Sequence, residues 1–251
     1  TYPILKEAGS FFESYLTYDA AAGEYNLKNA CALEGCTTPK NHAAQGRPQQ
    51  NVAMTLGWIA ATFKALARFS IILGVDGDQR GKWQAYLSKL APYPTTTYRN
   101  ETVFDEFDSS SDFGGNARYP VVYFGHIHPA AMVTKLSVTP EMMQVARNTV
   151  NQINAINHWI PTNGLCMAWP PAAVVSNNAS KTMNDFDSAL TAAMNNNFIP
   201  QIPSGCVAEQ AGALQGINDL MLQSYDGVLV CFPAGWDAAG GAFTSLRARG
   251  A

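Results

Sequence analysis

Two isolated glutamates, Glu34 and Glu209, are the residues whose type and surroundings most directly suggest chemistry. Glu34 lies in the segment Lys28–Cys36 and Glu209 in a Gly-rich segment, and each precedes a stretch with helical periodicity. Cleavage of a glycosidic bond uses two such carboxyl groups. Each position also has a simpler interpretation. Glu34 could cap a backbone amide in its loop, and Glu209 could be a first-turn helix acid that meets the helix dipole.

The two glutamates suit different steps of that reaction. Protonating a glycosidic oxygen needs a carboxyl group that stays neutral at about pH 6, which a semi-buried loop position can provide. Gly205 and Gly212 flank Glu209 and would let backbone and ligand come close. We therefore expect Glu34 to be a general acid and Glu209 to be a general base that activates water.

Two histidines and a tryptophan are candidates for binding a substrate. His126 and His128 alternate in the segment Tyr123–Pro129, a pattern compatible with a metal site, with bonds to sugar hydroxyls or with a buried structural histidine. A third metal ligand is not evident, so we expect no metal. Trp169, in Asn163–Pro171, could stack on the apolar face of a sugar or belong to the core.

Other sequence signals point away from cofactors. Four acids between positions 105 and 112 lack the spacing of a calcium loop, and we expect them to be solvated. They are Asp105, Glu106, Asp108 and Asp112. The sequence has no G-x-S-x-G elbow, P-loop or dinucleotide fingerprint. We therefore expect no cofactor.

Composition narrows the class of protein. The 251 residues are 47% hydrophobic and only 14% charged, with a net charge of −3. This charge gives no basic field to hold nucleic acid, and no run approaches about 18 apolar residues, so we expect neither a nucleic-acid partner nor a membrane span. The many uncharged polar residues suit a secreted carbohydrate-active protein.

Sequons and cysteines bear on the compartment. Asn100 and Asn178 begin N-glycosylation sequons, which have meaning only on a secretory route. The five cysteines fit no zinc pattern. Cys31 and Cys36 could bridge within their loop, and one thiol must stay free or pair outside the chain. We expect a secreted, extracellular glycoprotein.

Apolar spacing predicts a mostly α scaffold behind these residues. The predicted helices cover 3–17, 51–73, 78–90, 140–157, 181–196 and 209–225. The last of them ends at Gln223 and Ser224 and leads into a short apolar strand. No linker divides the chain, so we expect 1–251 to belong to one domain.

Taken in order, several segments resemble the catalytic barrel of glycoside hydrolase family ninety-five, the inverting α-L-fucosidases and their relatives. Ala32–Gly35 falls where the family has a Ser-Pro-Glu segment holding its general acid, and Gly125–Pro129 is similar to its His-Leu-Tyr-Pro segment. Asn163–Trp169 resembles its Gly-Trp-Ser-x-Ala-Trp segment. Leu222–Gly227 and Phe232–Ala234 are close to its Leu-Leu-Gln-Ser-His and Leu-Pro-Ala segments.

The resemblance implies a fold and an activity. The family fold is an (α/α)₆ barrel, a toroid of helices, with a site assembled from loops at one end. The implied reaction is attack of water at the anomeric carbon of a terminal α-L-fucosyl or related sugar, with inversion, between carboxyl groups ~6.5–9.5 Å apart. The N-terminal half of the barrel and the β-rich flanking domains would lie outside this chain, which could assemble with them or with other chains.

One segment departs from the family pattern. The family base is an Asp in Asp-Gly-Asn-Phe-Gly, whereas this chain has Cys206–Gly212, with Glu209 one position away. A catalytically inactive relative, serving as an extracellular structural, matrix or carbohydrate-binding protein, is therefore the alternative to an enzyme.

Overall fold

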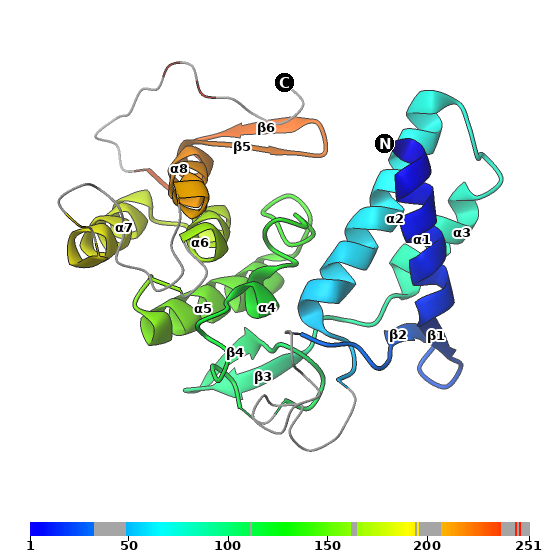
Figure 1. Cartoon of the computed structure of the whole chain (residues 1–251), viewed down its shortest axis with the longest axis horizontal. Helices are drawn as coiled ribbons and strands as arrows, with labels where there is room; N and C mark the ends of the chain where they lie inside the picture. Colours follow the sequence, from blue (N-terminus) through cyan, green and yellow to red (C-terminus); the bar gives the residue numbers. More distant parts are fainter. Residues whose placement is uncertain are drawn as a thin grey trace. The chain divides into compact units, whose positions relative to one another are not determined.

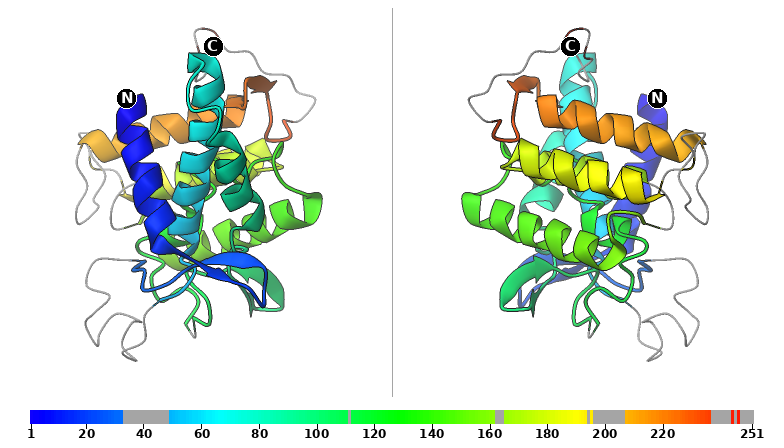
Figure 2. Two further views of the ribbon diagram at one scale, coloured as in Figure 1. Left: turned by 90° about the vertical axis from the view of Figure 1, so that its right-hand side faces the viewer. Right: turned by 90° about the vertical axis from the view of Figure 1, so that its left-hand side faces the viewer.

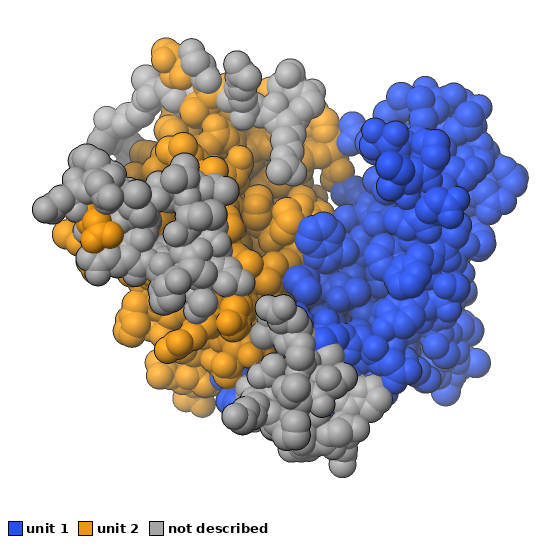
Figure 3. Space-filling view, in the orientation of Figure 1, with its two compact units in different colours: residues 1–96, 104–113 blue, residues 97–103, 114–251 orange. Residues whose placement is uncertain are grey.

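The computed structural model describes residues 1–32, 49–110, 112–161, 165–193, 195, 207–236, 244 and 246. In this part the chain is mainly helical, with short two-stranded antiparallel sheets (Figure 1). Two compact units are found, which Figure 3 colours separately. Unit 1 comprises 1–96 and 104–113, and unit 2 comprises 97–103 and 114–251. The prediction of a mostly helical chain is confirmed, and the prediction of a single domain stays a prediction.

Unit 1 is built around one long helix, α2, which packs against α1 and α3. Its elements are α1 Tyr2–Tyr15, β1 Leu16–Asp19, β2 Glu24–Leu27, α2 Ala53–Leu73 and α3 Arg80–Lys89. Leu56, Ile59 and Phe63 recur at helical spacing and form the buried face of α2. The predicted end of this helix at residue 73 is confirmed, because the next residue, Gly74, adopts a left-handed conformation with φ of 68°.

The helix α2 is also long and apolar enough to cross a membrane. It has 21 residues, and its most apolar window has a mean hydropathy of 1.5 with 39% of that window buried. Core helices of soluble proteins satisfy the same criterion. Lys64 and Arg68 interrupt the apolar run, which is why the sequence shows no continuous span.

Unit 2 is a group of helices gathered on α6, which packs against α5, α7 and α8 (Figure 2). Its helices are α4 Val121–Phe124, α5 Pro140–Asn157, the 3-10 turn η2 Leu165–Met167, α6 Trp169–Val175, α7 Ala179–Ala193 and α8 Val207–Met221. Its hairpin strands are β5 Leu222–Tyr225 and β6 Val228–Cys231. A further hairpin pairs β3 Thr95–Tyr98 with β4 Glu101–Phe104. The boundaries between the two units fall within these two strands.

The predicted helix over 209–225 is wrong at its C-terminal end. Leu222–Tyr225 is a strand, paired with Val228–Cys231 across a two-residue turn. Asp226 and Gly227 both have positive φ, at 55° and 84°, as a type I′ hairpin turn requires. The local Asp-Gly signal therefore overrides the helical periodicity that continues through Gln223.

The helix α6 does not appear among the helices predicted from the sequence, and its first turn contains Pro170 and Pro171. Proline is tolerated in the first turn of a helix, where its missing N–H would have no intrahelical partner. In this position the two prolines begin α6 rather than end a helix.

Candidate functional site

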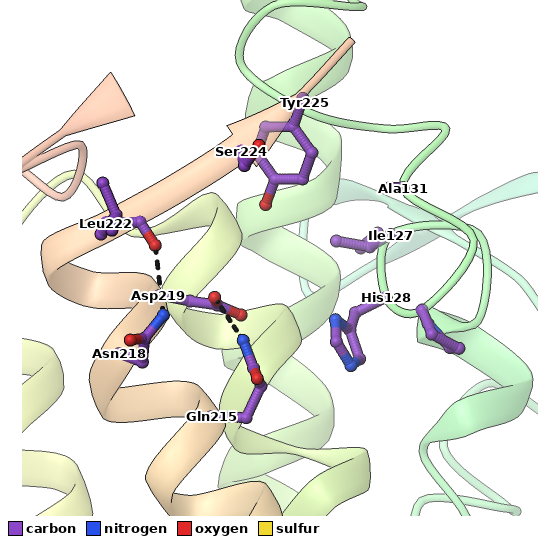
Figure 4. A pocket seen from close by; sticks show the side chains of 10 residues that line it. Ile127, His128, Ala131, Gln215, Asn218, Asp219, Leu222, Ser224 and Tyr225 are labelled. Carbon is purple, nitrogen blue, oxygen red and sulfur yellow. Dashed lines mark hydrogen bonds between the residues drawn. The ribbon is translucent and has the colours of Figure 1, made fainter. Parts of the chain in front are cut away.

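Unit 2 contains a small cavity between α8, β5 and the loop that follows α4. Its volume is about 90 Å³. The residues that line it are Ile127, His128, Pro129, Ala131, Gln215, Asn218, Asp219, Leu222, Ser224 and Tyr225 (Figure 4). Six of these side chains can donate or accept hydrogen bonds, and the other four are apolar, which is the mixture typical of a small-ligand site.

The sequence of α8 explains why three polar side chains meet at this cavity. Gln215, Asn218 and Asp219 are spaced i, i+3 and i+4, so they share one face of the helix. Gly212 and Gly216 lie about a quarter turn away. A Cβ atom on Gly212 would meet Cys166 Cα, and one on Gly216 would lie 2.9 Å from Trp169 Cβ. The two glycines therefore let α8 approach η2 and α6 closely.

Asp219 is the carboxylate of this cavity. It is 8% exposed, and its Oδ1 accepts a 2.6 Å hydrogen bond from Gln215 Nε2. Its backbone carbonyl accepts a 2.7 Å bond from Gln223 Nε2, and that amide also donates to Ala173 O. Gln223 is itself 2% exposed and fixes the point where α8 passes into β5. The geometry of this carboxylate therefore depends on two side-chain amides, the half-buried Gln215 and the buried Gln223.

The two histidines of the predicted sugar-binding segment have different surroundings. His128 is half-buried and lines the cavity. His126 is 0% exposed, and burial lowers its pKa to about 3, so its imidazole is neutral at ordinary pH. Of the interpretations that the sequence left open, a buried structural histidine describes this location of His126.

Trp169 lies in the core of unit 2. It is 0% exposed, stacks on Phe186 at a centroid distance of 4.0 Å, and donates from Nε1 to Trp159 O at 3.2 Å. Its indole faces are therefore occupied by protein, and the core interpretation describes its location. The prediction that it stacks on a sugar has no support in this arrangement.

The structure describes the two predicted catalytic glutamates to different extents. Glu34 lies outside the described residues. Glu209 lies in the first turn of α8, the backbone position that its simpler interpretation as a first-turn helix acid expects, and its side chain lies outside the described part. The structure thus does not place the two carboxyl groups together, and their catalytic roles stay predictions.

Residues beside the Glu34 segment form a buried polar anchor in unit 1. Gln49 is 6% exposed, its carbonyl accepts from Ala30 N at 3.0 Å, and its Oε1 accepts from Ala32 N at 2.5 Å. Asn51 is 4% exposed and bonds Leu27 N through Oδ1 at 2.8 Å. These bonds fix the chain on both sides of residues 33–48.

The acidic segment after β4 is not the solvated loop that the sequence predicts. Asp105 and Glu106 are 2% and 0% exposed, and the Glu106 carbonyl accepts from Ala53 N at 3.0 Å at the start of α2. Asp108 is exposed and accepts from Asn51 Nδ2 at 2.7 Å. Across the described ranges, no three His, Cys, Asp or Glu side chains are grouped in a way that could hold a metal ion.

The predicted modification sites lie at the surface. Asn100 is exposed in the turn between β3 and β4, and Asn178 is exposed just before α7. Asn178 Oδ1 accepts from Lys181 N at 2.8 Å and so caps α7. Cys31 is disulfide-bonded, and Cys36, its predicted partner, lies outside the described residues. Cys231 is an exposed thiol on β6.

Comparison with known proteins decides the family. Residues 1–200 match the model of the glycosyl hydrolase family 95 catalytic domain. The chain belongs to glycosyl hydrolase family 95. No curated protein matches the sequence. The matched range includes Glu34, His126, His128 and Trp169, and it ends before Glu209.

Membership in this family supports glycoside hydrolase activity and implies that the substrate is a glycan. The resemblance found in the sequence is thereby confirmed. Sequence reasoning missed Gln215, Asn218 and Asp219 as candidate site residues. Their spacing on one helical face could have identified them. Asp219, however, lies within a helix and belongs to no recognisable motif.

Proposed function

We propose that this chain is part of the catalytic domain of a glycoside hydrolase that releases terminal α-L-fucosyl or related residues from glycans with inversion. The observation that carries the proposal is the family 95 match over residues 1–200. The proposed architecture is an (α/α)₆ barrel to which these helices contribute. The predominance of helices and the polar cavity in unit 2 are consistent with a sugar-binding helical domain.

In this proposal Glu34 is the general acid and Glu209 the general base. The buried bonds that Gln49 makes to Ala30 and Ala32 support a defined placement of the chain next to Glu34. The position of Glu209 at the start of α8 puts it on the helix that also lines the cavity. Protonation of the leaving oxygen and activation of water are the two proton transfers that inversion needs.

Of the predicted sugar-binding residues His126, His128 and Trp169, the proposal keeps only His128 as a direct contact with the sugar. His128 lines the cavity directly. Trp169 underlies α8 at Gly216, and the carbonyl of the buried His126 accepts from Met132 N at 3.0 Å and so shapes the loop that closes the cavity. His126 and Trp169 therefore act by supporting the cavity, and His128 by contact with the sugar.

We also propose that the protein is extracellular and glycosylated. The disulfide at Cys31 supports this, because such bonds persist in oxidising compartments. The exposed positions of Asn100 and Asn178 are accessible to glycosylation. A glycan on Asn178 would modify Nδ2 and leave the capping Oδ1 in place.

A catalytically inactive relative that binds carbohydrate in a matrix or structural role is the second candidate. It is favoured by one observation, the departure of Cys206–Gly212 from the Asp-Gly-Asn-Phe-Gly segment of the resembling family. Such a protein would keep the cavity and its bonds but would not turn over a glycoside.

The deciding experiment is hydrolysis of α-L-fucosylated and α-galactosylated oligosaccharides by the full-length protein, with the released anomer identified by NMR. Release of the β-anomer, with Glu34→Gln and Glu209→Gln each slowing turnover by about 10²–10⁴-fold, is the expected result. Glu7→Gln, an exposed change on α1, is the matched control and should leave the rate unchanged. Unchanged rates in either site variant would refute that residue's role, and saturable binding without release would favour the inactive relative.

A further inference from the structure

A second cavity of unit 2 lies between the glycine-containing loop before α4 and the C-terminal end of α5. Its volume is about 590 Å³, within the ~300–1,000 Å³ typical of sites for small organic ligands. The residues that line it are Gly114, Gly115, Ala117, Arg118, Ile156, Asn157, His158 and Ile160. Half of these residues are exposed, Arg118 and His158 among them, so the cavity opens to solvent. We call it the Arg118 cavity.

One buried amide holds the two walls of the Arg118 cavity together. Asn157 is 8% exposed, and its Nδ2 donates to Ala117 O at 3.0 Å. Its Oδ1 accepts from Trp159 N at 2.9 Å, which fixes the chain just beyond α5. Gly114 has a φ of 89°, and a Cβ atom added to it would lie 2.6 Å from Ile156 Cδ1. The walls are therefore set before a ligand binds, which reduces the entropic cost of binding.

The lining carries cationic side chains and no anionic ones. Arg118 contributes a permanent guanidinium and His158 an imidazole with an N–H donor, whereas none of the eight lining residues is Asp or Glu. Among the described residues, neither of these two side chains has a hydrogen-bond or ion-pair partner. In a chain with a net charge of −3, this is a locally cationic cavity whose donors are available to a ligand.

The end of α5 opposes this charge only weakly. A helix C-terminus carries roughly half a negative charge on its unbonded carbonyl groups. Here Asn154 O accepts from Trp159 N and Asn157 O accepts from Ile160 N, both at 3.1 Å, so these two carbonyls are already bonded. The full positive charge of Arg118 therefore exceeds the opposing charge of the helix end, and an anionic group is favoured.

The remaining lining residues indicate what carries the anionic group. A guanidinium presents two parallel N–H groups that match two oxygens of a carboxylate or a sulfate. Ile156 and Ile160 add an apolar surface, which the C–H groups on the face of a sugar ring can contact. The family to which the chain belongs acts on glycans. A sugar that bears a carboxylate or a sulfate therefore suits both the charge and the apolar surface of the cavity.

We propose that the Arg118 cavity binds an acidic sugar, with Arg118 and His158 donating to its carboxylate or sulfate and with Ile156 and Ile160 against its ring. The inference rests on the proposed function only for the choice of a glycan as the ligand. The proposed hydrolase releases a neutral terminal sugar, so the Arg118 cavity recognises a different unit of the glycan and takes no part in bond cleavage.

The test is calorimetric titration of the full-length protein at low ionic strength with D-galacturonate, D-galactose 6-sulfate, D-galactose and inorganic sulfate. We expect saturable binding of at least one acidic sugar, tighter than that of D-galactose and of inorganic sulfate by about 10-fold or more. The tighter of the two acidic sugars identifies whether the cavity prefers a carboxylate or a sulfate. Added salt should weaken this binding, because the cationic side chains are exposed and their charge is screened.

Two variants assign the binding to this cavity. Arg118→Ala should weaken the binding of the acidic sugar by about 10-fold or more and leave that of D-galactose unchanged. Arg68→Ala is the matched control, since Arg68 is exposed on α2 and also lacks a partner among the described residues. His158→Asn suits the left-handed conformation at this position and should weaken binding by about 3-fold or more. It keeps the test valid if Arg118→Ala does not fold.

Three results would overturn the inference. They are no saturable binding of either acidic sugar, affinity for both acidic sugars no higher than for D-galactose or inorganic sulfate, and acidic-sugar binding that neither cavity variant weakens. None of these titrations requires hydrolysis. Acidic-sugar binding that depends on Arg118, together with no release of fucose from fucosylated oligosaccharides, would therefore refute only the proposed hydrolase function.

Discussion

At the scale of single residues, several polar and ionisable side chains of this chain are buried rather than exposed. His126, Asp105, Glu106, Gln49 and Asn51 are each less than a tenth exposed. Their positions could not be derived from the sequence, because burial is a property of the packed unit and the same residue types are ordinarily found at the surface. Two of them yield direct predictions.

His126 should make the protein sensitive to acid. Its pKa is about 3 in the folded protein and about 6.5 in an unfolded chain, so between these values the unfolded state binds more protons. This contribution to stability is fully present above pH 6.5 and is lost as the pH falls towards 3, at up to about 1.4 kcal/mol per pH unit. Urea unfolding at a series of pH values from 7 to about 4.5 measures the slope.

The matched pair for that measurement is His126→Gln and His158→Asn. His126→Gln removes the buried titrating group and should flatten the pH dependence of stability by about one proton. His158 is exposed at the C-terminus of α5 with φ of 55°, a conformation that Asn tolerates, so His158→Asn should keep the slope of the parent protein. An identical slope in all three proteins would contradict the assignment to His126.

We expect a change at Gln49 to affect the rate of hydrolysis more than the affinity for sugar. Gln49→Ala removes the side-chain acceptor of Ala32 N, two residues before the proposed general acid Glu34, and a displacement of about 1 Å in a catalytic group can cost up to 100-fold in rate. We expect kcat to fall 10-fold or more, with little change in the affinity for free sugar. Gln50→Ala is the control, since Gln50 is exposed and adjacent. Equal effects of the two variants on kcat would argue against a positioning role for Gln49.

At the scale of elements, the sequence predicted helices well where the apolar periodicity agreed with the residues that begin or end a helix. The helix α5 was predicted with its observed bounds because Pro140 and Glu141 mark its first turn, and in the structure Thr139 also caps it, accepting from Met142 N at 3.3 Å. The errors arose where two local signals competed. The Asp226-Gly227 turn converts the end of a helical pattern into a hairpin, and the Pro170-Pro171 pair begins a helix. The first of these errors affects the candidate cavity, because β5 contributes Leu222, Ser224 and Tyr225 to its lining.

The contact between α8 and its neighbours gives a prediction at this scale. A Cβ atom on Gly212 would overlap the backbone of Cys166, which cannot rotate away, so Gly212→Ala must displace α8 from η2. We expect a loss of stability of about 1–3 kcal/mol and weaker sugar binding, because α8 lines the candidate cavity. Gly81→Ala in α3 is the comparison, since nothing lies within 4 Å of its added carbon. That change should stabilise its helix by about 0.5–1 kcal/mol. Both effects are read from urea unfolding.

At the scale of the whole molecule, the two compact units have separate sets of buried side chains. Phe63 stacks on Tyr86 at 4.8 Å in unit 1, and Trp169 stacks on Phe186 at 4.0 Å in unit 2. Proteins built from several compact units often depart from a single unfolding transition. A ligand that binds one unit therefore stabilises that unit directly. Any stabilisation of the other unit measures how cooperatively the two units unfold.

Hydrogen exchange with and without a neutral sugar tests this organisation. At a ligand concentration about 100 times Kd, the unit that binds should gain about 2.7 kcal/mol, which slows exchange through its global opening about 100-fold. Because the cavity lies wholly in unit 2, peptides from α6 and α8 should show this slowing, and peptides from α2 should not. Equal slowing in α2 and α8 would mean that the two units unfold as one, whereas slowing confined to α2 would place the sugar outside the cavity of unit 2.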